Sequence, residues 1–104
     1  MQNKFLNLLG LCRKAGMLSL GFSKAKDSIQ RQKTKIIFLA ADVSKKTEKE
    51  LRFASQNQQI EIIRTIYPIF EFSSGLDMKA GVAAVEDSGF AKALKEKLEG
   101  GNLI

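Results

Sequence analysis

The residues best placed to do chemistry lie where a glycine opens a short basic helix. Gly21-Phe22-Ser23 precedes a stretch with helical spacing, and Lys24 and Lys26 fall in its first turns. A helix start presents backbone N–H groups that lack intrahelical acceptors, together with the positive end of the helix dipole, and both attract phosphate. Gly21 has no side chain to keep a phosphate or a base at a distance. On local sequence alone, an anion-binding helix start and a plain turn before a helix fit this pattern equally well.

Side chains for catalysis or metal binding are scarce in this chain. It contains no histidine, the commonest general base and zinc ligand. Its one cysteine, Cys12, lies on an apolar helical stripe, where cysteine acts as a small hydrophobic residue. The acidic pairs Glu48/Glu50 and Glu86/Asp87 fall on solvated faces or at a helix cap, and no phosphate-loop or dinucleotide motif occurs. We therefore expect a protein that is not an enzyme, with no cofactor, metal or small-molecule substrate.

Positive charge is concentrated in the first half of the sequence. The chain has 104 residues and a formal net charge of +6. Residues 1–52 contain 12 Lys and Arg against 4 Asp and Glu, whereas residues 53–104 contain 5 against 7. A folded protein with one basic pole suits a polyanion such as RNA. Lysines that merely solvate helix faces would produce a similar composition, so the asymmetry favours RNA without deciding it.

Three features of the sequence concern the cellular location of the protein. No run of 18 or more apolar residues is present, so we expect no membrane span. The first residues enter an amphipathic pattern directly and lack the apolar core of a signal peptide. A single cysteine cannot form an internal disulfide. These features predict a cytoplasmic protein, which we expect to be a monomer.

Helical and strand patterns alternate along the chain with short connections. The first helix carries an apolar stripe of Phe5, Leu8, Leu9, Cys12 and Ala15, and Gly16 follows it. The remaining helices are expected at residues 22–32 and 45–57, as a short helix with Pro68 in its first turn that Gly75 ends, and from Asp87 to a stop at Gly100-Gly101. Strands are expected at residues 35–41, 60–63 and 82–85, with a connector or strand at 17–20. The alternation predicts an α/β fold in which helices cover a sheet.

Several segments resemble the ribosomal-protein family L-seven-Ae (L7Ae). Residues 21–43, GFSKAKDSIQRQKTKIIFLAADV, align without a gap to the family's core block of glycine, short helix, apolar strand and Ala-Glu-Asp-Val. Residues 75–85, GLDMKAGVAAV, are similar to the family's second RNA loop and the strand after it. The opening residues 8–18 and the segment 87–92 look like those of the bacterial YlxQ-like group.

The resemblance implies a three-layer α/β/α sandwich with a central mixed sheet, formed by residues 1–104 as a single ribosomal-protein-like RNA-binding domain. It also implies recognition of kink-turn RNA, in which an Asn, a Glu and a Lys at the helix start reach guanine edges. The family's second loop packs against the flipped-out nucleotide of the bend. Carried onto this chain, the predicted RNA-binding residues are Gly21, Phe22, Ser23, Lys24, Lys26, Asp27, Arg31, Leu76, Met78 and Lys79.

The chain departs from the family at its base-reading positions. Ser23, Lys24 and Asp27 stand where the family has Asn, Glu and Lys. Positions 24 and 27 share a helix face, so Lys24 and Asp27 either read a base pair with inverted polarity or pair with each other in solvent. In the loop, Leu76 and Met78 either contact an unstacked base or pack into the core.

The sequence therefore predicts non-enzymatic binding of structured RNA, kink-turn-like and possibly ribosomal, by the second helix start and the second loop. One alternative is a protein-interaction adaptor on the same fold whose RNA face has been lost. The departures at the helix start favour the adaptor, and the basic pole argues against it. A further alternative is a substrate-recognition domain appended to an RNA-modifying enzyme.

Overall fold

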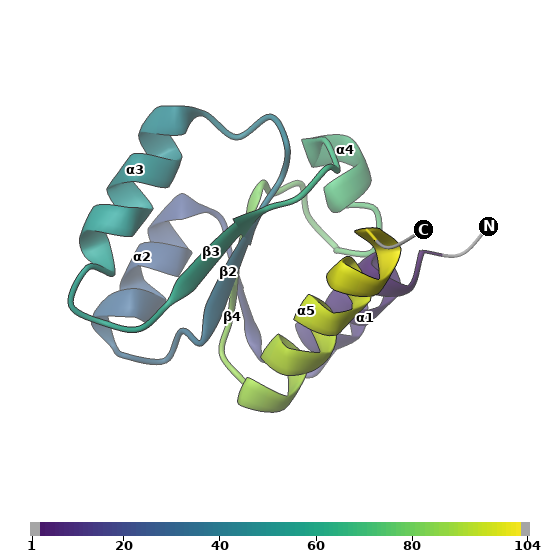
Figure 1. Cartoon of the computed structure of the whole chain (residues 1–104), viewed down its shortest axis with the longest axis horizontal. Coiled ribbons are helices and arrows are strands. Elements are labelled where there is room, and N and C mark those ends of the chain that lie inside the picture. Colours follow the sequence, from purple (N-terminus) through teal and green to yellow (C-terminus); the bar gives the residue numbers. More distant parts are fainter. Residues whose placement is uncertain (1–2, 103–104) are drawn as a thin grey trace.

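The computed structural model describes residues 3–102, which form a sheet with helices on both faces (Figure 1). The elements follow in the order α1 (Lys4–Lys14), β1 (Leu18–Leu20), α2 (Phe22–Gln30), β2 (Ile36–Leu39), α3 (Lys45–Ala54), β3 (Glu61–Arg64), α4 (Ile69–Phe72), β4 (Val82–Val85) and α5 (Ser88–Asn102). Helices α2 and α3 lie on one face of the sheet, and α1 and α5 lie on the other. The three-layer α/β/α arrangement expected from the resemblance is confirmed.

The sheet is mixed, and its topology gathers several chain segments at one edge. The strand order is β1-β4-β2-β3, with β4 antiparallel to both of its neighbours and β2 parallel to β3. Strands β1, β2 and β3 therefore run in the same direction. They end at one edge of the sheet, called the carboxyl edge below, where β4 begins. Helices α2, α3 and α4 consequently all start at the carboxyl edge (Figure 1).

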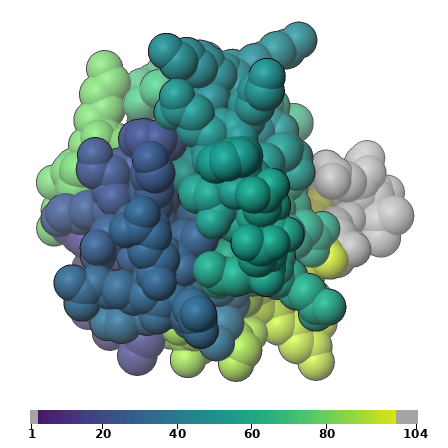
Figure 2. Space-filling view, turned by 90° about the vertical axis from the view of Figure 1, so that its left-hand side faces the viewer, coloured from purple at the N-terminus to yellow at the C-terminus, as the bar shows by residue number. Residues whose placement is uncertain are grey.

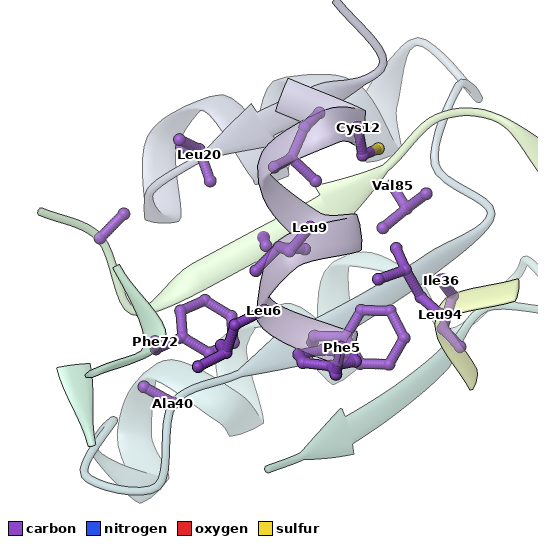
Figure 3. Packing of buried hydrophobic residues seen from close by; sticks show 14 residues of the cluster. Phe5, Leu6, Leu9, Cys12, Leu20, Ile36, Ala40, Phe72, Val85 and Leu94 are labelled. Carbon is purple, nitrogen blue, oxygen red and sulfur yellow. The ribbon is translucent and has the colours of Figure 1, made fainter. Parts of the chain in front are cut away.

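Strand β2 is buried on both faces and separates two hydrophobic clusters. Phe38 packs under α1 against Phe5, and the two rings meet edge-on at a centroid distance of 5.1 Å. Figure 3 shows Phe5 in this cluster, with Leu9 of the same helix. Ile37 points to the opposite face, where it joins Ile29 of α2 and Leu51 of α3. Full burial of such side chains is worth about 1.5–3 kcal/mol each. The sandwich is thus anchored on the continuous apolar run that the sequence shows at residues 35–41.

Some helix boundaries differ from the expected ones. Helix α5 runs to Asn102, so the stop expected at Gly100-Gly101 is wrong. Each glycine costs only about 1 kcal/mol relative to alanine inside a helix, which weakens a helix without breaking it. Helix α4 ends at Phe72, before Gly75, which therefore does not end it. Gly16 follows α1 with a φ of +76°, as expected for a helix end.

The buried face of α1 includes Phe5, Leu9 and Cys12 of the predicted stripe, but it is not identical to that stripe. Leu6 and Gly10 are buried, whereas Ala15, at the helix C-cap, is exposed. Cys12 is fully buried, and desolvation, with smaller effects of Asp87 and Glu86, raises the pKa of its thiol to about 12. Cys12 therefore packs as a neutral, small hydrophobic side chain.

No helix within residues 3–102 is long and apolar enough to cross a bilayer.

Candidate nucleic-acid interface

Gly21 opens α2 in a conformation that a glycine adopts without strain. Its φ is +91°, and its N–H donates to the Val82 carbonyl at 2.8 Å, which ties the start of α2 to the start of β4. A Cβ built at Gly21 would meet no atom within 4 Å. The glycine is therefore required by backbone conformation, and the space in front of it is open to a ligand.

The start of α2 also lacks the side-chain cap found on the other long helices. Asn3, Ser44 and Asp87 accept a backbone N–H at the starts of α1, α3 and α5, at 3.0, 3.1 and 2.9 Å. Gly21 has no side chain to do the same, and the first intrahelical bond runs from Ala25 N–H to its carbonyl. The preceding N–H groups of α2 thus lie beyond the helical ladder, where they can bind an anion.

The predicted side chains of α2 surround this opening. Ser23, Lys24 and Lys26 are exposed, and the Lys26 ammonium lies over the Phe22 ring, 5.6 Å from its centroid. The cation–π contact holds the Lys26 charge near the first turn of the helix. These residues form one basic, solvent-facing surface at the carboxyl edge.

Asp27 pairs with Arg31 in the next turn of the helix. The Arg31 Nε lies 3.0 Å from Asp27 Oδ2, and both side chains are more than half exposed. Exposed pairs of this kind contribute only about 0–1 kcal/mol, so a nucleic acid can compete for either partner. One interpretation of the sequence pairs Asp27 with Lys24 in an exposed ion pair, whereas in the structure Asp27 pairs with Arg31.

The second predicted segment is a loop between α4 and β4, called the 73–81 loop below. Ser73 closes it, since its Oγ donates to the Ala80 carbonyl and accepts the Ala80 N–H, both at 2.9 Å. Leu76 is half-buried against the main hydrophobic cluster, whereas Met78 is 40% exposed and Lys79 is exposed. Met78 and Lys79 are therefore accessible to a ligand, and Leu76 serves mainly to hold the loop down.

Helix α1 fixes the position of this loop. The Arg13 Nε donates to Asp77 Oδ1 at 2.9 Å, and this hydrogen bond lowers the pKa of the Asp77 carboxyl. Gly10 and Gly75 pack so closely that a Cβ on Gly10 would lie 2.7 Å from the Gly75 carbonyl oxygen. Arg13 and Gly10 are not predicted from the sequence as parts of the site, because their partners lie more than 60 positions away along the chain.

Gly10→Ala is expected to displace the 73–81 loop. The added methyl group meets backbone, and overpacking of this kind costs about 1–3 kcal/mol. Alanine gains about 1 kcal/mol in helix propensity, which only partly offsets that cost. Thermal unfolding should show a lower melting temperature, with Asn7→Ala, at an exposed position of the same helix, as the control. A variant that is more stable than the parent would show that the loop moves aside freely.

The segment after β2 is held at the same edge by Arg64. Its Nη1 donates to the carbonyls of Ala41 at 3.0 Å and Val43 at 2.6 Å, and its other nitrogens bind Glu48. Glu48 also accepts from Arg52, and the hydrogen bonds from Arg52 and Arg64 lower the pKa of its carboxyl. This network fixes the turn that joins β2 to α3 next to the start of α2.

Glu48→Gln is expected to remove a pH-dependent part of the stability. A carboxyl whose pKa is lowered on folding stabilises the protein above its unfolded pKa, and the effect is lost as the pH falls through the folded pKa. The Arg64 and Glu48 side chains are 30% and 23% exposed, so we expect only about 1 kcal/mol at neutral pH. Urea unfolding should show this difference shrinking below the ordinary glutamate pKa of about 4.3. A difference that does not change with pH would contradict the charge-based explanation.

Both predicted segments share one face of the molecule. In Figure 2 the light-green residues near position 80 stand at the upper left, directly above the purple-blue start of α2. The bond from Gly21 to Val82 places them side by side. The structure thus brings together the α2 residues and the 73–81 loop, and their contact with RNA stays a prediction.

The fold is that of the L7Ae class of proteins. Residues 3–66 match the Ribosomal protein L7Ae/L30e/S12e/Gadd45 family, and the chain belongs to this family. It is 31% identical over 99 residues to the RNA-binding protein YlxQ of Enterococcus faecium, with 95% of each chain covered. The matched residues 3–66 include α2 and Arg64 but not the 73–81 loop.

Two solved structures share the fold. A protein with unknown function from Bacillus halodurans superimposes with a TM-score of 0.85 at 23% identity, covering 94% of this chain and 99% of that one. The 15.5kD RNA binding protein of Giardia lamblia superimposes with a TM-score of 0.68 at 17% identity, covering 90% of this chain and 81% of that one.

Proposed function

We propose that this chain binds structured RNA without catalysing a reaction, and that bent stems of the kink-turn kind are its preferred targets. The binding surface is the carboxyl edge. The observation that carries the proposal is the 2.8 Å bond from Gly21 to Val82. It joins the uncapped start of α2 to the end of the 73–81 loop, the two segments that the family resemblance assigns to RNA.

The two segments have different tasks. The open N–H groups of α2, with Lys24, Lys26 and Arg31, bind phosphates, which gives affinity and fixes the orientation of the RNA. Ser23 and Asp27 face the same way and read base edges, while Met78 gives an apolar contact to a nucleotide that has left the stack. A bent stem presents its backbone and an unstacked base together, which a straight duplex does not.

The related proteins support this function. The Enterococcus faecium and Giardia lamblia proteins are both named as RNA-binding, and the family description is that of ribosomal proteins. The net charge of +6 fits a polyanionic partner. We also propose that residues 1–104 act as a single domain and as a cytoplasmic monomer, with ribosomal RNA among the targets.

The proposal is tested with a kink-turn RNA and a straight duplex of the same base composition. Fluorescence anisotropy at two salt concentrations gives the affinity for each RNA and its salt dependence. We expect tighter binding to the bent stem and a steep loss of affinity with salt, because phosphate contacts release counterions. No binding to either RNA at low salt would favour the adaptor alternative.

A further inference from the structure

A basic groove runs between α2 and α3 on the face shown in Figure 2. Its volume is about 700 Å³, within the range of ligand-binding clefts. It is lined by Lys26 and Gln30 of α2 and by Lys46, Lys49, Glu50 and Phe53 of α3. These residues are called the α2–α3 groove below. Three lysines against one glutamate give it a net positive charge, which suits an anionic occupant.

Phe53 gives this groove an aromatic surface that the fold does not use. Its side chain is 71% exposed, although it belongs to the last turns of α3. Leu51 and Ala54 supply the inward contacts of the same helix, so the core does not need the Phe53 ring. A flat exposed ring beside several lysines is the combination with which proteins bind single-stranded nucleic acid, since bases stack on the ring and phosphates meet the cations.

The α2–α3 groove is continuous with the carboxyl edge. Both helices start at that edge, and Lys26 belongs both to the first turns of α2 and to the groove wall. An RNA strand held at the start of α2 that continues along the protein would therefore enter the groove. An acidic peptide could bind the same lysines, but it offers no flat partner for the Phe53 ring.

We propose that the α2–α3 groove binds a single-stranded RNA segment that extends from the structured RNA, with phosphates on Lys46 and Lys49 and a base stacked on Phe53. This inference rests on the proposed function and extends the interface beyond the bent stem. The protein then recognises a bent stem together with its flanking single strand. A stem that ends flush at the carboxyl edge leaves the groove empty.

The test compares a kink-turn RNA with and without a single-stranded tail of about ten nucleotides, added at either end. The full-length protein is titrated with each RNA, and with the tail oligonucleotide alone, in fluorescence anisotropy. We expect one of the two tailed RNAs to bind more tightly than the stem. If the oligonucleotide alone binds and the stem does not, the groove is supported and the proposed function is wrong. If the stem binds and neither tail adds affinity, the groove inference is wrong.

The variants assign the effect to named residues. Phe53→Ala is expected to lower the affinity gained from the tail at least about five-fold, because stacking on one aromatic ring contributes that much or more. Phe53→Trp keeps a stacking surface and should retain the gain. Lys46→Gln with Lys49→Gln should reduce the salt slope of tail binding by about 0.7 for each phosphate that no longer meets a lysine. Lys92→Gln with Lys97→Gln, on α5 across the sheet, removes the same charge and should leave the tail effect unchanged.

The control measurements separate folding and net charge from binding in the groove. Phe53 is exposed, so melting temperatures of all variants should match the parent, and affinity for the untailed stem should survive in Phe53→Ala. Equal loss of tail binding in the α5 variant and the groove variant would show that only net charge matters, which overturns the inference. Tight binding of a polyglutamate peptide in the groove, with no response to the RNA tail, would assign the groove to a protein partner and overturn it as well.

Discussion

Neutralising Lys24, Lys26 and Arg31 together, each by glutamine, is expected to weaken RNA binding roughly a hundred-fold at about 0.15 M salt. Each phosphate bound by a cation contributes about 0.7–0.9 to the slope of affinity against salt on logarithmic axes, so removing three cations should also flatten that slope by about two to three. The affinity should fall by a similar factor for RNAs of any sequence, because contacts to phosphates at the start of α2 carry no sequence information. The measurement is a salt titration of affinity for a bent and a straight RNA.

A matched control lies on the opposite side of the sheet. Lys92, Lys95 and Lys97 of α5 carry the same total charge, and one cation in each set is in an exposed ion pair: Arg31 with Asp27, and Lys95 with Glu61. The α5 variant should keep most of the affinity. If both variants lose affinity equally, the effect is one of net charge, and the interface does not lie at the carboxyl edge. Unchanged melting temperatures are expected for both, since all these side chains are on the surface.

Much of the fold follows from local patterns in the sequence. The apolar run at residues 35–41 predicts a strand covered on both faces, and β2 is buried along its whole length between two helical layers. Gly16 and Ser44 mark a helix end and a helix start, where backbone geometry and capping favour these residue types. The order β1-β4-β2-β3 could not be predicted from such patterns. It places the last strand in the sequence at the centre of the sheet, and that depends on contacts between distant segments.

Only part of the candidate site could be predicted from the sequence. The open start of α2 could be predicted because a glycine before a helix leaves its first N–H groups uncapped, and those residues lie next to one another in the chain. Arg13 and Arg64 could not be predicted. Their partners, Asp77 and Glu48, are 64 and 16 positions away, and a lone arginine gives no signal of such pairing. For Leu76 the sequence leaves a base contact and the core as alternatives, and the folded chain places the side chain against the core.

Restoring the family's helix-start pattern, with Ser23→Asn, Lys24→Glu and Asp27→Lys, is expected to increase the preference for a kink-turn over a straight duplex about ten-fold or more. These three exposed positions can change with little effect on the core. A glutamate at position 24 is favourable near the helix start, and the introduced lysine lies four residues from Arg31, which costs only about 0.2–0.5 kcal/mol. Each well-formed contact to a base edge is worth about 1–3 kcal/mol of discrimination.

The outcome depends on whether the 73–81 loop still accepts the displaced nucleotide. If it does, the triple variant gains specificity for the bent RNA. Its overall affinity at low salt changes little, because the net charge stays the same and charge is only moved from one position of α2 to another. The matched control is Ser23→Asn alone, which adds one side-chain amide and leaves Lys24 and Asp27 in place. A gel-shift comparison of the two RNAs gives the ratio of affinities for each variant. If the triple variant shows no preference for the bent stem, the loop around Met78 no longer fits a kink-turn, and the adaptor function explains the altered helix start better.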